Sequence, residues 1–127
     1  KNKKKFNNIS FNRFNIDLEN KIKKHDILLH LSKREGLPVS VMQSLSEGLP
    51  VICYNIRGNN DLIKDRYNGY FVRSYKEVPN IIYYLNLEDG IFKKMRLNAF
   101  KSINKDLLKK QINLNIYNII KNYSKLK

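Results

Sequence analysis

The strongest constraint on the fold lies between Asp26 and Tyr54, where two short apolar runs flank a segment of helix length. The first run, Asp26 to Leu31, has the length of a buried strand, and so has the second, Pro50 to Tyr54. Between them, apolar residues at helical spacing follow Pro38, which suits a first helical turn, and Gly48 stands where the helix would end. The segment predicts strand, loop, helix and strand, which is a parallel crossover unit.

The loop of this unit consists of Glu35, Gly36, Leu37 and Pro38. In parallel α/β sheets, ligands bind where the carboxyl end of a strand meets the amino end of the next helix. Free backbone N–H groups at a helix start attract anions, and a carboxylate such as Glu35 accepts hydrogen bonds from hydroxyl groups. Gln43 follows about two helical turns later, so both side chains are expected on one face. The pattern fits a phosphorylated sugar.

The segment SKREGLPVSVMQSLSEGLPVI, which starts at Ser32, resembles the donor-site signature of group 1 (family 4) glycosyltransferases. Those enzymes have the GT-B fold of two facing Rossmann-like domains, and a Glu, seven residues and a second Glu lie on this loop and helix. Glu35 matches the first Glu, which the resemblance places near the donor sugar. Gln43 replaces the second, near the ribose hydroxyls, and offers a neutral amide with one acceptor oxygen. The resemblance therefore implies weakened ribose binding.

Downstream residues extend the resemblance. The runs IRGNNDLI, over 56–63, and NGYFV, over 68–72, are similar to the loop, short helix and final strand of family members that build capsules and exopolysaccharides. Arg57, Gly58 and Asn59 lie in this loop, and we expect them either to line the donor cleft or to form a plain surface turn.

We interpret the 127 residues as one partial donor-binding domain, with a strand and helix core over 8–72 and a helical tail over 75–127. The fold class is α/β, a Rossmann-like parallel sheet from a GT-B carboxyl-terminal domain, followed by helices. Family members begin this domain with two further strand–helix units, which carry an Arg and a Lys for the donor diphosphate, and an acceptor-binding domain precedes them. Neither has a counterpart here, so the resemblance implies an amino-terminally truncated chain that needs the missing domain or a partner chain.

Other elements follow from local patterns. A strand is predicted over Ile9 to Phe14, a short helix over Asp17 to Lys24, and another over Asp61 to Lys64 with Asn60 as its cap. Three amphipathic helices are predicted after Tyr75. Their predicted buried stripes are Val78, Ile81, Ile82 and Leu85; then Ile91, Met95 and Phe100; and last Leu108, Ile112, Ile116, Ile119, Ile120 and Tyr123.

The net charge of +14 bears on the partners of the chain. A strongly basic domain is attracted to any polyanion. The lysines are nevertheless scattered over predicted helices and no zinc-finger or RNP-like motif is present, so we expect no nucleic acid partner. A phosphorylated donor or an anionic membrane surface would use the charge, the latter by peripheral association. A solvated lysine face is the plainest alternative.

The cysteine and histidines carry no sign of special chemistry. Cys53 is interpreted as an inert core thiol. Because it is the only cysteine in the sequence, an intrachain disulfide is excluded. His25 and His30 lack metal-ligand spacing and are interpreted as structural, although His30 stands near the end of its strand. We expect no metal and no cofactor, since the nucleotide sugar is a substrate. Without a signal peptide pattern or a membrane-length apolar run, the sequence predicts a cytoplasmic location, with the inner face of the membrane as an alternative.

The resemblance implies a glycosyltransferase that transfers a hexosyl group from a nucleotide sugar to a glycan or lipid-linked acceptor in surface polysaccharide biosynthesis. Glu35 would contact the donor sugar, residues 36–38 would shape the loop, and Gln43 would hold the ribose, while no catalytic residue is assigned to this chain. Because the reaction needs two opposed domains to exclude water and place the acceptor, the chain alone is expected to be nearly inactive. The alternative is an inactive module that binds a partner transferase or a nucleotide without turnover.

Overall fold

The computed structural model describes residues 8–9 and 18–103 of the chain. Three parallel strands form one sheet in the order β1-β2-β3: β1 is Leu28–His30, β2 is Val51–Tyr54 and β3 is Gly69–Val72. The helices are α1 (Leu18–Ile22), α2 (Val39–Ser46), α3 (Asn59–Leu62), α4 (Val78–Leu87) and α5 (Asp89–Ser102), with a 3-10 helix η1 at Tyr75–Glu77. The strand predicted over 9–14, apart from Ile9, and the stripe predicted over 108–123 lie outside the described residues.

The crossover unit predicted from the central segment is confirmed. β1 pairs in parallel with β2, so that Leu28 stands beside Val51 and His30 beside Cys53, and α2 connects the two strands. β2 pairs in parallel with β3 on its other side. The chain is therefore α/β with a Rossmann-like parallel sheet, and β2, between two neighbours, is buried along almost its whole length.

Local chemistry explains where α2 begins and ends. Pro38 stands at its amino end, and the Pro38 carbonyl accepts hydrogen bonds from the N–H groups of Val41 and Met42 at 3.0 and 3.1 Å. The helix ends before Gly48, which has a φ of +74°, and the Gly48 N–H donates to the Leu45 carbonyl at 2.9 Å. A left-handed residue is a common helix terminator, and glycine adopts that conformation without a Cβ penalty.

Two apolar clusters cover the two faces of the sheet. On the face of α2 and α5, the buried members are Val41, Leu45, Val51, Cys53, Ile63 and Ala99. On the face of α4, they are Ile52, Val72 and Val78, with Tyr54, Tyr70 and Ile81 packed against them. Successive strand residues point to opposite faces, which is why Val51 and Cys53 belong to one cluster and Ile52 to the other.

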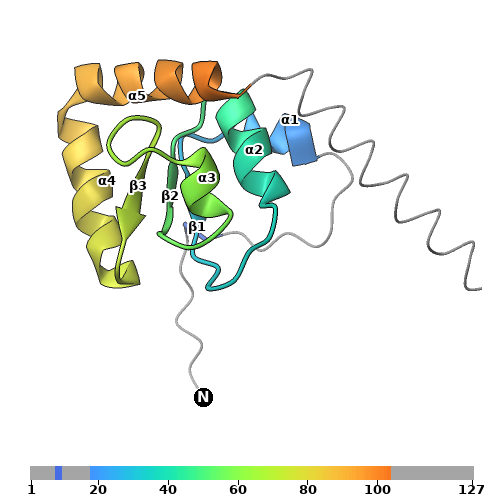
Figure 1. Ribbon diagram of the computed structural model, residues 1–127. Helices are drawn as coiled ribbons and strands as arrows, with labels where there is room; N and C mark the ends of the chain where they lie inside the picture. The colour runs from blue at the N-terminus through green and yellow to red at the C-terminus, as the bar shows by residue number, and fades with distance from the viewer. Residues whose placement is uncertain (1–7, 10–17, 104–127) are drawn as a thin grey trace, which may run out of the picture.

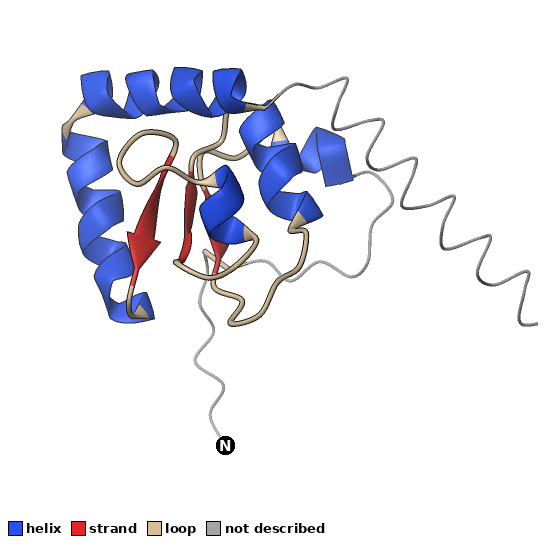
Figure 2. Ribbon diagram, in the orientation of Figure 1, coloured by secondary structure: helices blue, strands red, loops and turns tan. Residues whose placement is uncertain are grey.

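The figures show how this arrangement exposes one edge of the sheet. In Figure 1, α5 crosses over the ends where the strands begin, and α4 flanks β3. In Figure 2 all three arrows point away from α5, so the loops that follow the strands gather at the opposite, carboxyl edge. This is the edge at which ligands bind in open α/β sheets.

The start of α3 differs from the prediction. The helix begins at Asn59, before the predicted Asp61, and Gly58 occupies the position before it with a φ of +88°. The predicted Asn60 cap is therefore wrong, because Asn60 already lies inside the helix and its N–H donates to the Ile56 carbonyl at 3.0 Å. The left-handed torsion of Gly58 turns the chain into the helix earlier than a capping side chain would.

The helices of the tail bury narrower faces than predicted. Val78 and Leu85 of α4 are buried as expected and Ile81 packs on the sheet, but Ile82 is 45% exposed. Ile82 also follows helical spacing from Val78, but it lies on the opposite side of Val78 from Ile81, at the margin of the buried stripe. A helix that contacts only one sheet face and one neighbouring helix buries a single narrow stripe.

The predicted stripe of α5 was partly wrong. The helix starts at Asp89 and buries Met95 and Ala99, four residues apart, while Ile91 and Phe100 are largely exposed. α5 packs against α2, and the small side chain of Ala99 allows the two helices to approach closely. The sequence pattern favoured the large apolar residues, but the contact uses the small one.

Replacing Leu45 with alanine tests this core. Leu45 is fully buried between α2 and the sheet, so its truncation leaves a cavity, and we expect a loss of about 2–5 kcal/mol in the free energy of unfolding. Urea unfolding followed by circular dichroism measures the change. Leu87→Ala is the matched control, because Leu87 is 62% exposed and its truncation should cost much less. Equal losses for the two variants would contradict the assigned core.

Candidate functional site

The candidate site lies at the carboxyl edge, where one loop follows each strand. The β1 loop contains Glu35, Gly36, Leu37 and Pro38 and leads into α2, and the β2 loop contains Gly58 and leads into α3. The two loops lie directly against each other. A Cβ placed on Gly58 would stand 2.8 Å from the Gly36 carbonyl oxygen and 3.3 Å from Cδ of Pro38. The structure thus brings the predicted donor loop together with the predicted cleft-lining loop, through a contact that only glycine permits.

Glu35 is in close contact with a residue of β1. Its Oε1 lies 3.1 Å from Nε2 of His30, and the side chains of Glu35 and His30 are 24% and 13% exposed. The approach is close, but within the described part of the chain Nε2 of His30 makes no hydrogen bond of good geometry, and it is itself buried. A carboxylate thus stands at the edge of the sheet with an imidazole nitrogen behind it.

The backbone N–H groups around the start of α2 are hydrogen-bond donors in the same loop region as the Glu35 carboxylate. The N–H groups of Val39, Val41 and Met42 are bonded to the carbonyls of Leu37 and Pro38. Those of Gly36 and Leu37 donate no hydrogen bond within the part of the chain that the structure describes. Free amides at the start of a helix attract anionic groups.

Gln43 lies in the middle of α2 and its side chain is half-buried. Its backbone carbonyl accepts a hydrogen bond from the Ser46 hydroxyl at 2.8 Å, which leaves its side-chain amide outside that bond. An amide with one acceptor oxygen and two donors can bond a diol, although without the charge of a carboxylate. The assignment of Gln43 to a ribose remains a prediction.

The three residues predicted as cleft lining have different surroundings. Arg57 is exposed at the edge, and Gly58 is buried under the donor loop. Asn59 is fully buried, and its Nδ2 donates to the Tyr54 carbonyl at 3.0 Å, while its Oδ1 has no hydrogen-bond partner among residues 8–9 and 18–103. Asn59 therefore contributes to the edge indirectly, because its hydrogen bond to Tyr54 holds the loop that leaves β2.

A second feature of this edge lies on the α4 face. A cavity of about 410 Å³ is lined by Lys33, Tyr54, Ile56, Arg73 and Ser74, which stand at or just after the ends of the three strands. Lys33 and Arg73 bring two positive charges to it. Glu77 lies close by, where its Oε1 accepts hydrogen bonds from the N–H groups of Arg73 and Ser74 at 3.0 and 2.8 Å.

Cys53 takes no part in chemistry at this edge. The side chain is fully buried on the α2 face, and burial, together with the negative charge of Asp65, raises the pKa of Cys53 to about 12. A thiol that stays protonated at neutral pH is a poor nucleophile. The predicted core position of Cys53 is confirmed, and its raised pKa agrees with an inert thiol.

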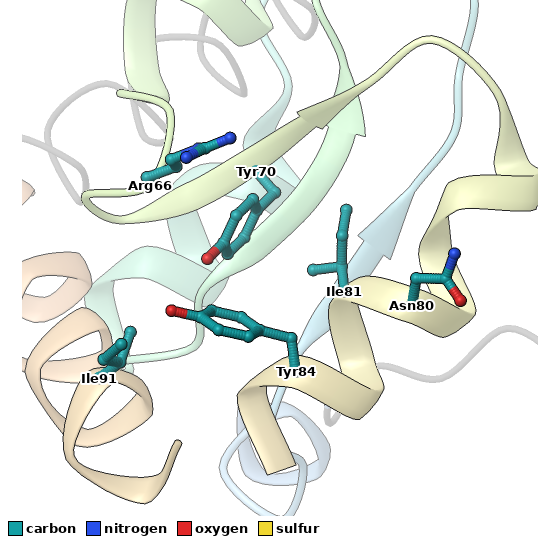
Figure 3. A pocket seen from close by; sticks show the side chains of 6 residues that line it. All are labelled: Arg66, Tyr70, Asn80, Ile81, Tyr84 and Ile91. Carbon is teal, nitrogen blue, oxygen red and sulfur yellow. The ribbon is translucent and has the colours of Figure 1, made fainter. Parts of the chain in front are cut away.

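A larger cavity of about 570 Å³ lies away from the candidate site (Figure 3). It is lined by Arg66, Tyr70, Asn80, Ile81, Tyr84 and Ile91, and the hydroxyls of Tyr70 and Tyr84 point toward each other. Burial raises the pKa of Tyr70, with Tyr84 acting in the same direction. Because it opens near the amino end of β3, this cavity is separate from the edge that carries Glu35.

Among the described residues, no three histidine, cysteine, aspartate or glutamate side chains gather as metal ligands, and none of the described helices is both long and apolar enough to cross a bilayer.

The family model described as "Glycosyl transferases group 1" matches residues 1–101. The chain belongs to this family. Among the curated relatives of this group 1 chain is the Escherichia coli UDP-Gal:alpha-D-GlcNAc-diphosphoundecaprenol alpha-1,3-galactosyltransferase, which is 31% identical over 116 residues. The match covers 87% of this chain and 26% of the relative, so the chain spans about a quarter of that protein.

Solved structures show the same fold as this group 1 chain. Anabaena HepE in complex with UDP has a TM-score of 0.67 at 19% identity, covering 83% of this chain and 31% of that one. The C-terminal domain of the group 1 glycosyl transferase LpcC from Francisella tularensis has a TM-score of 0.63 at 20% identity, covering 74% and 49%. The predicted GT-B relationship of the fold is confirmed.

Several features of the edge were not predicted. The contact between His30 and Glu35 needs the loop to fold back over β1, which no local pattern reports. Lys33 and Arg73 were also missed. Arg73 directly follows a predicted strand and Lys33 stands two residues after one, and that position was the available signal. In a chain with a net charge of +14, a single lysine or arginine after a strand is a weak signal of a binding site.

Replacing Gly58 with alanine tests the contact between the two loops. A Cβ would meet the Gly36 carbonyl at 2.8 Å, and the φ of +88° strains any other residue, so we expect a loss of about 1–3 kcal/mol of stability. Gly90→Ala is the matched control, since nothing lies within 4 Å there and alanine favours a helix. Urea unfolding of both variants gives the comparison, and a Gly58→Ala chain as stable as Gly90→Ala would refute the close approach.

Proposed function

We propose that this chain is the donor-binding part of a glycosyltransferase that transfers a hexosyl group from a nucleotide sugar. The single observation that carries the proposal is the placement of Glu35 in a loop at the carboxyl edge, in a chain of the glycosyl transferases group 1 family. The neighbouring backbone amides donate no hydrogen bond to any residue that the structure describes. Carboxylate oxygens accept hydrogen bonds from sugar hydroxyls, and free amides favour a phosphate.

The same edge suggests a division of work among the residues. Glu35 contacts the donor sugar, residues 36–38 shape the loop, and Gln43 accepts from the ribose. Arg57 extends from the neighbouring loop, and Gly58 allows that loop to approach. In this proposal no metal takes part, because hydroxyl and phosphate groups are met by side chains and amides.

The acceptor in this proposal is a glycan or a lipid-linked sugar in surface polysaccharide biosynthesis. Support comes from the Escherichia coli relative, whose name describes a diphosphoundecaprenol-linked acceptor, and from complexes of similar structures with UDP and UDP-glucose. A cytoplasmic chain with a charge of +14 can also approach an anionic inner membrane face, where such an acceptor is held. Nucleic acid is not a partner in this proposal.

Group 1 enzymes of the GT-B type react between two domains, and opposing domains exclude water and align the reactants. The chain spans about a quarter of the Escherichia coli relative. We therefore propose that turnover needs a second domain or partner chain, and that these 127 residues alone bind a donor without transferring it at a useful rate.

A second candidate is an inactive module that binds a partner transferase or a nucleotide without turnover. The observation that favours it is Gln43, which stands where the family signature has a second Glu. Loss of that charge removes one of the strongest hydrogen-bond acceptors available to a ribose. Binding measurements separate the two candidates.

Calorimetric titration of the folded chain with a panel of nucleotide sugars and free nucleotides tests the donor site. We expect Glu35→Ala to weaken binding of a nucleotide sugar at least tenfold and to leave the matching free nucleotide nearly unchanged, because Glu35 faces the sugar. Glu88→Ala is the control, since Glu88 is exposed and makes no side-chain cap bond. If the folded wild-type chain binds no nucleotide sugar, the inactive module replaces the donor-binding proposal.

Restoring a carboxylate at position 43 tests the ribose assignment. Gln43→Glu supplies two charged acceptor oxygens, and we expect the affinity for UDP to rise by about three- to tenfold. The gain should shrink for 2′-deoxy-UDP, which lacks one hydroxyl, and calorimetry measures both. The same gain for both nucleotides, or no gain for either, would place Gln43 away from the ribose.

A further inference from the structure

The contact behind Glu35 joins two elements that the chain brings together only by folding. His30 is the last residue of β1, and Glu35 lies in the loop that follows it. His30 pairs with Cys53 in the sheet, so its side chain lies on the α2 face, which is the side from which the loop returns. The imidazole is thus fixed by the strand, whereas the carboxylate is carried by a loop.

Nε2 of His30 is an unused hydrogen-bonding atom. It is buried, none of the described residues offers it a hydrogen-bond partner of good geometry, and Oε1 of Glu35 stands 3.1 Å away. Buried polar atoms are nearly always bonded, because leaving one without a partner destabilises the fold. Hydrogen bonds at sites without ligand are often poorly aligned and tighten when the ligand is present.

The surroundings leave Glu35 as the natural partner of this nitrogen. The neighbouring Cys53 stays a neutral thiol, because burial raises the pKa of Cys53 to about 12, and so it offers no competing negative charge. Glu35 is an acceptor when ionised, so an N–H on Nε2 would complete the pair. A carboxylate held through one oxygen keeps the other oxygen free for a sugar hydroxyl.

We propose that His30 is a positioning residue, whose Nε2–H donates to the Glu35 carboxylate and holds it toward the hydroxyls of the donor sugar. This inference rests on the proposed donor site and adds the group that orients its carboxylate. A glutamate in a loop has three side-chain torsions to order, and fixing one oxygen in advance lowers the cost of ordering them when the sugar binds. Preorganisation of this kind acts only on ligands that carry the sugar.

Binding by His30 variants of the 127-residue chain tests this role. His30→Leu removes the donor and keeps apolar bulk, and His30→Gln restores an N–H. We expect His30→Leu to weaken nucleotide-sugar binding about tenfold with UDP binding unchanged, and His30→Gln to recover most of the loss. His25→Leu is the control, because His25 is the other histidine, is exposed, and contacts the Lys21 carbonyl.

The same titrations in a Glu35→Gln background show whether His30 acts through Glu35. Once the carboxylate is gone, His30→Leu should cause no further loss. An equal loss in both backgrounds, an equal loss for UDP and the nucleotide sugar, or no loss at all would overturn the proposal. Unchanged unfolding midpoints exclude a general loss of structure.

If the chain binds no nucleotide sugar, the donor-binding proposal fails. A measurement without ligand then still tests whether His30 donates to Glu35. Ring nitrogen NMR at mildly alkaline pH, where histidine is ordinarily neutral, reports which nitrogen carries the proton. We expect the Nε2–H form for His30, with a resonance that moves in Glu35→Gln, and His25→Leu assigns the signals. If His30 carries its proton on Nδ1 instead, Nε2 is an acceptor that faces the acceptor oxygen Oε1 of Glu35, and the proposal is overturned.

Discussion

Parallel pairing of β2 with a strand on each side is the constraint on which the rest of the structure depends. Because β1, β2 and β3 all run in one direction, their following loops leave from one edge, and residues far apart in the sequence meet there. β2 is buried against both apolar clusters, so its register cannot slip by one residue without exchanging the faces of Val51, Ile52 and Cys53. The place of the site follows from this register.

Chemistry at the edge divides between the two faces of the sheet. On the α2 side stand Glu35, the imidazole behind it and the amides at the start of the helix. On the α4 side, Lys33 and Arg73 line a cavity whose acidic neighbour, Glu77, is already engaged by two backbone N–H groups. An edge with a carboxylate on one side and cations on the other suits a ligand that is both anionic and rich in hydroxyls.

Membership of the glycosyl transferases group 1 family gives this edge a context. The similar solved structures share the fold at about one-fifth identity, so what they have in common with this chain is the arrangement of strands and helices. That arrangement needs little sequence identity, because buried residues of matching volume and a period of two along the strands suffice to maintain it. The residues at the edge are where chains of one fold differ in chemistry.

The sequence by itself determined the central unit, since each of its signals is local. The apolar runs of β1 and β2, the start of α2 after Pro38 and its end before Gly48 were all predicted within one or two residues. The place of Glu35 in the loop between β1 and α2 was predicted for the same reason, since a position between a strand and a helix can be counted along the chain.

Only the tertiary structure decided the contacts that span the edge. The approach of Gly58 to Gly36 and the close contact of His30 with Glu35 depend on how two loops fold over a sheet, and Ala99 is buried because α5 packs against α2. Periodicity reports which residues are apolar, but it does not report which neighbour they meet. Local patterns therefore predicted the elements, and packing between distant segments placed the groups that would act together.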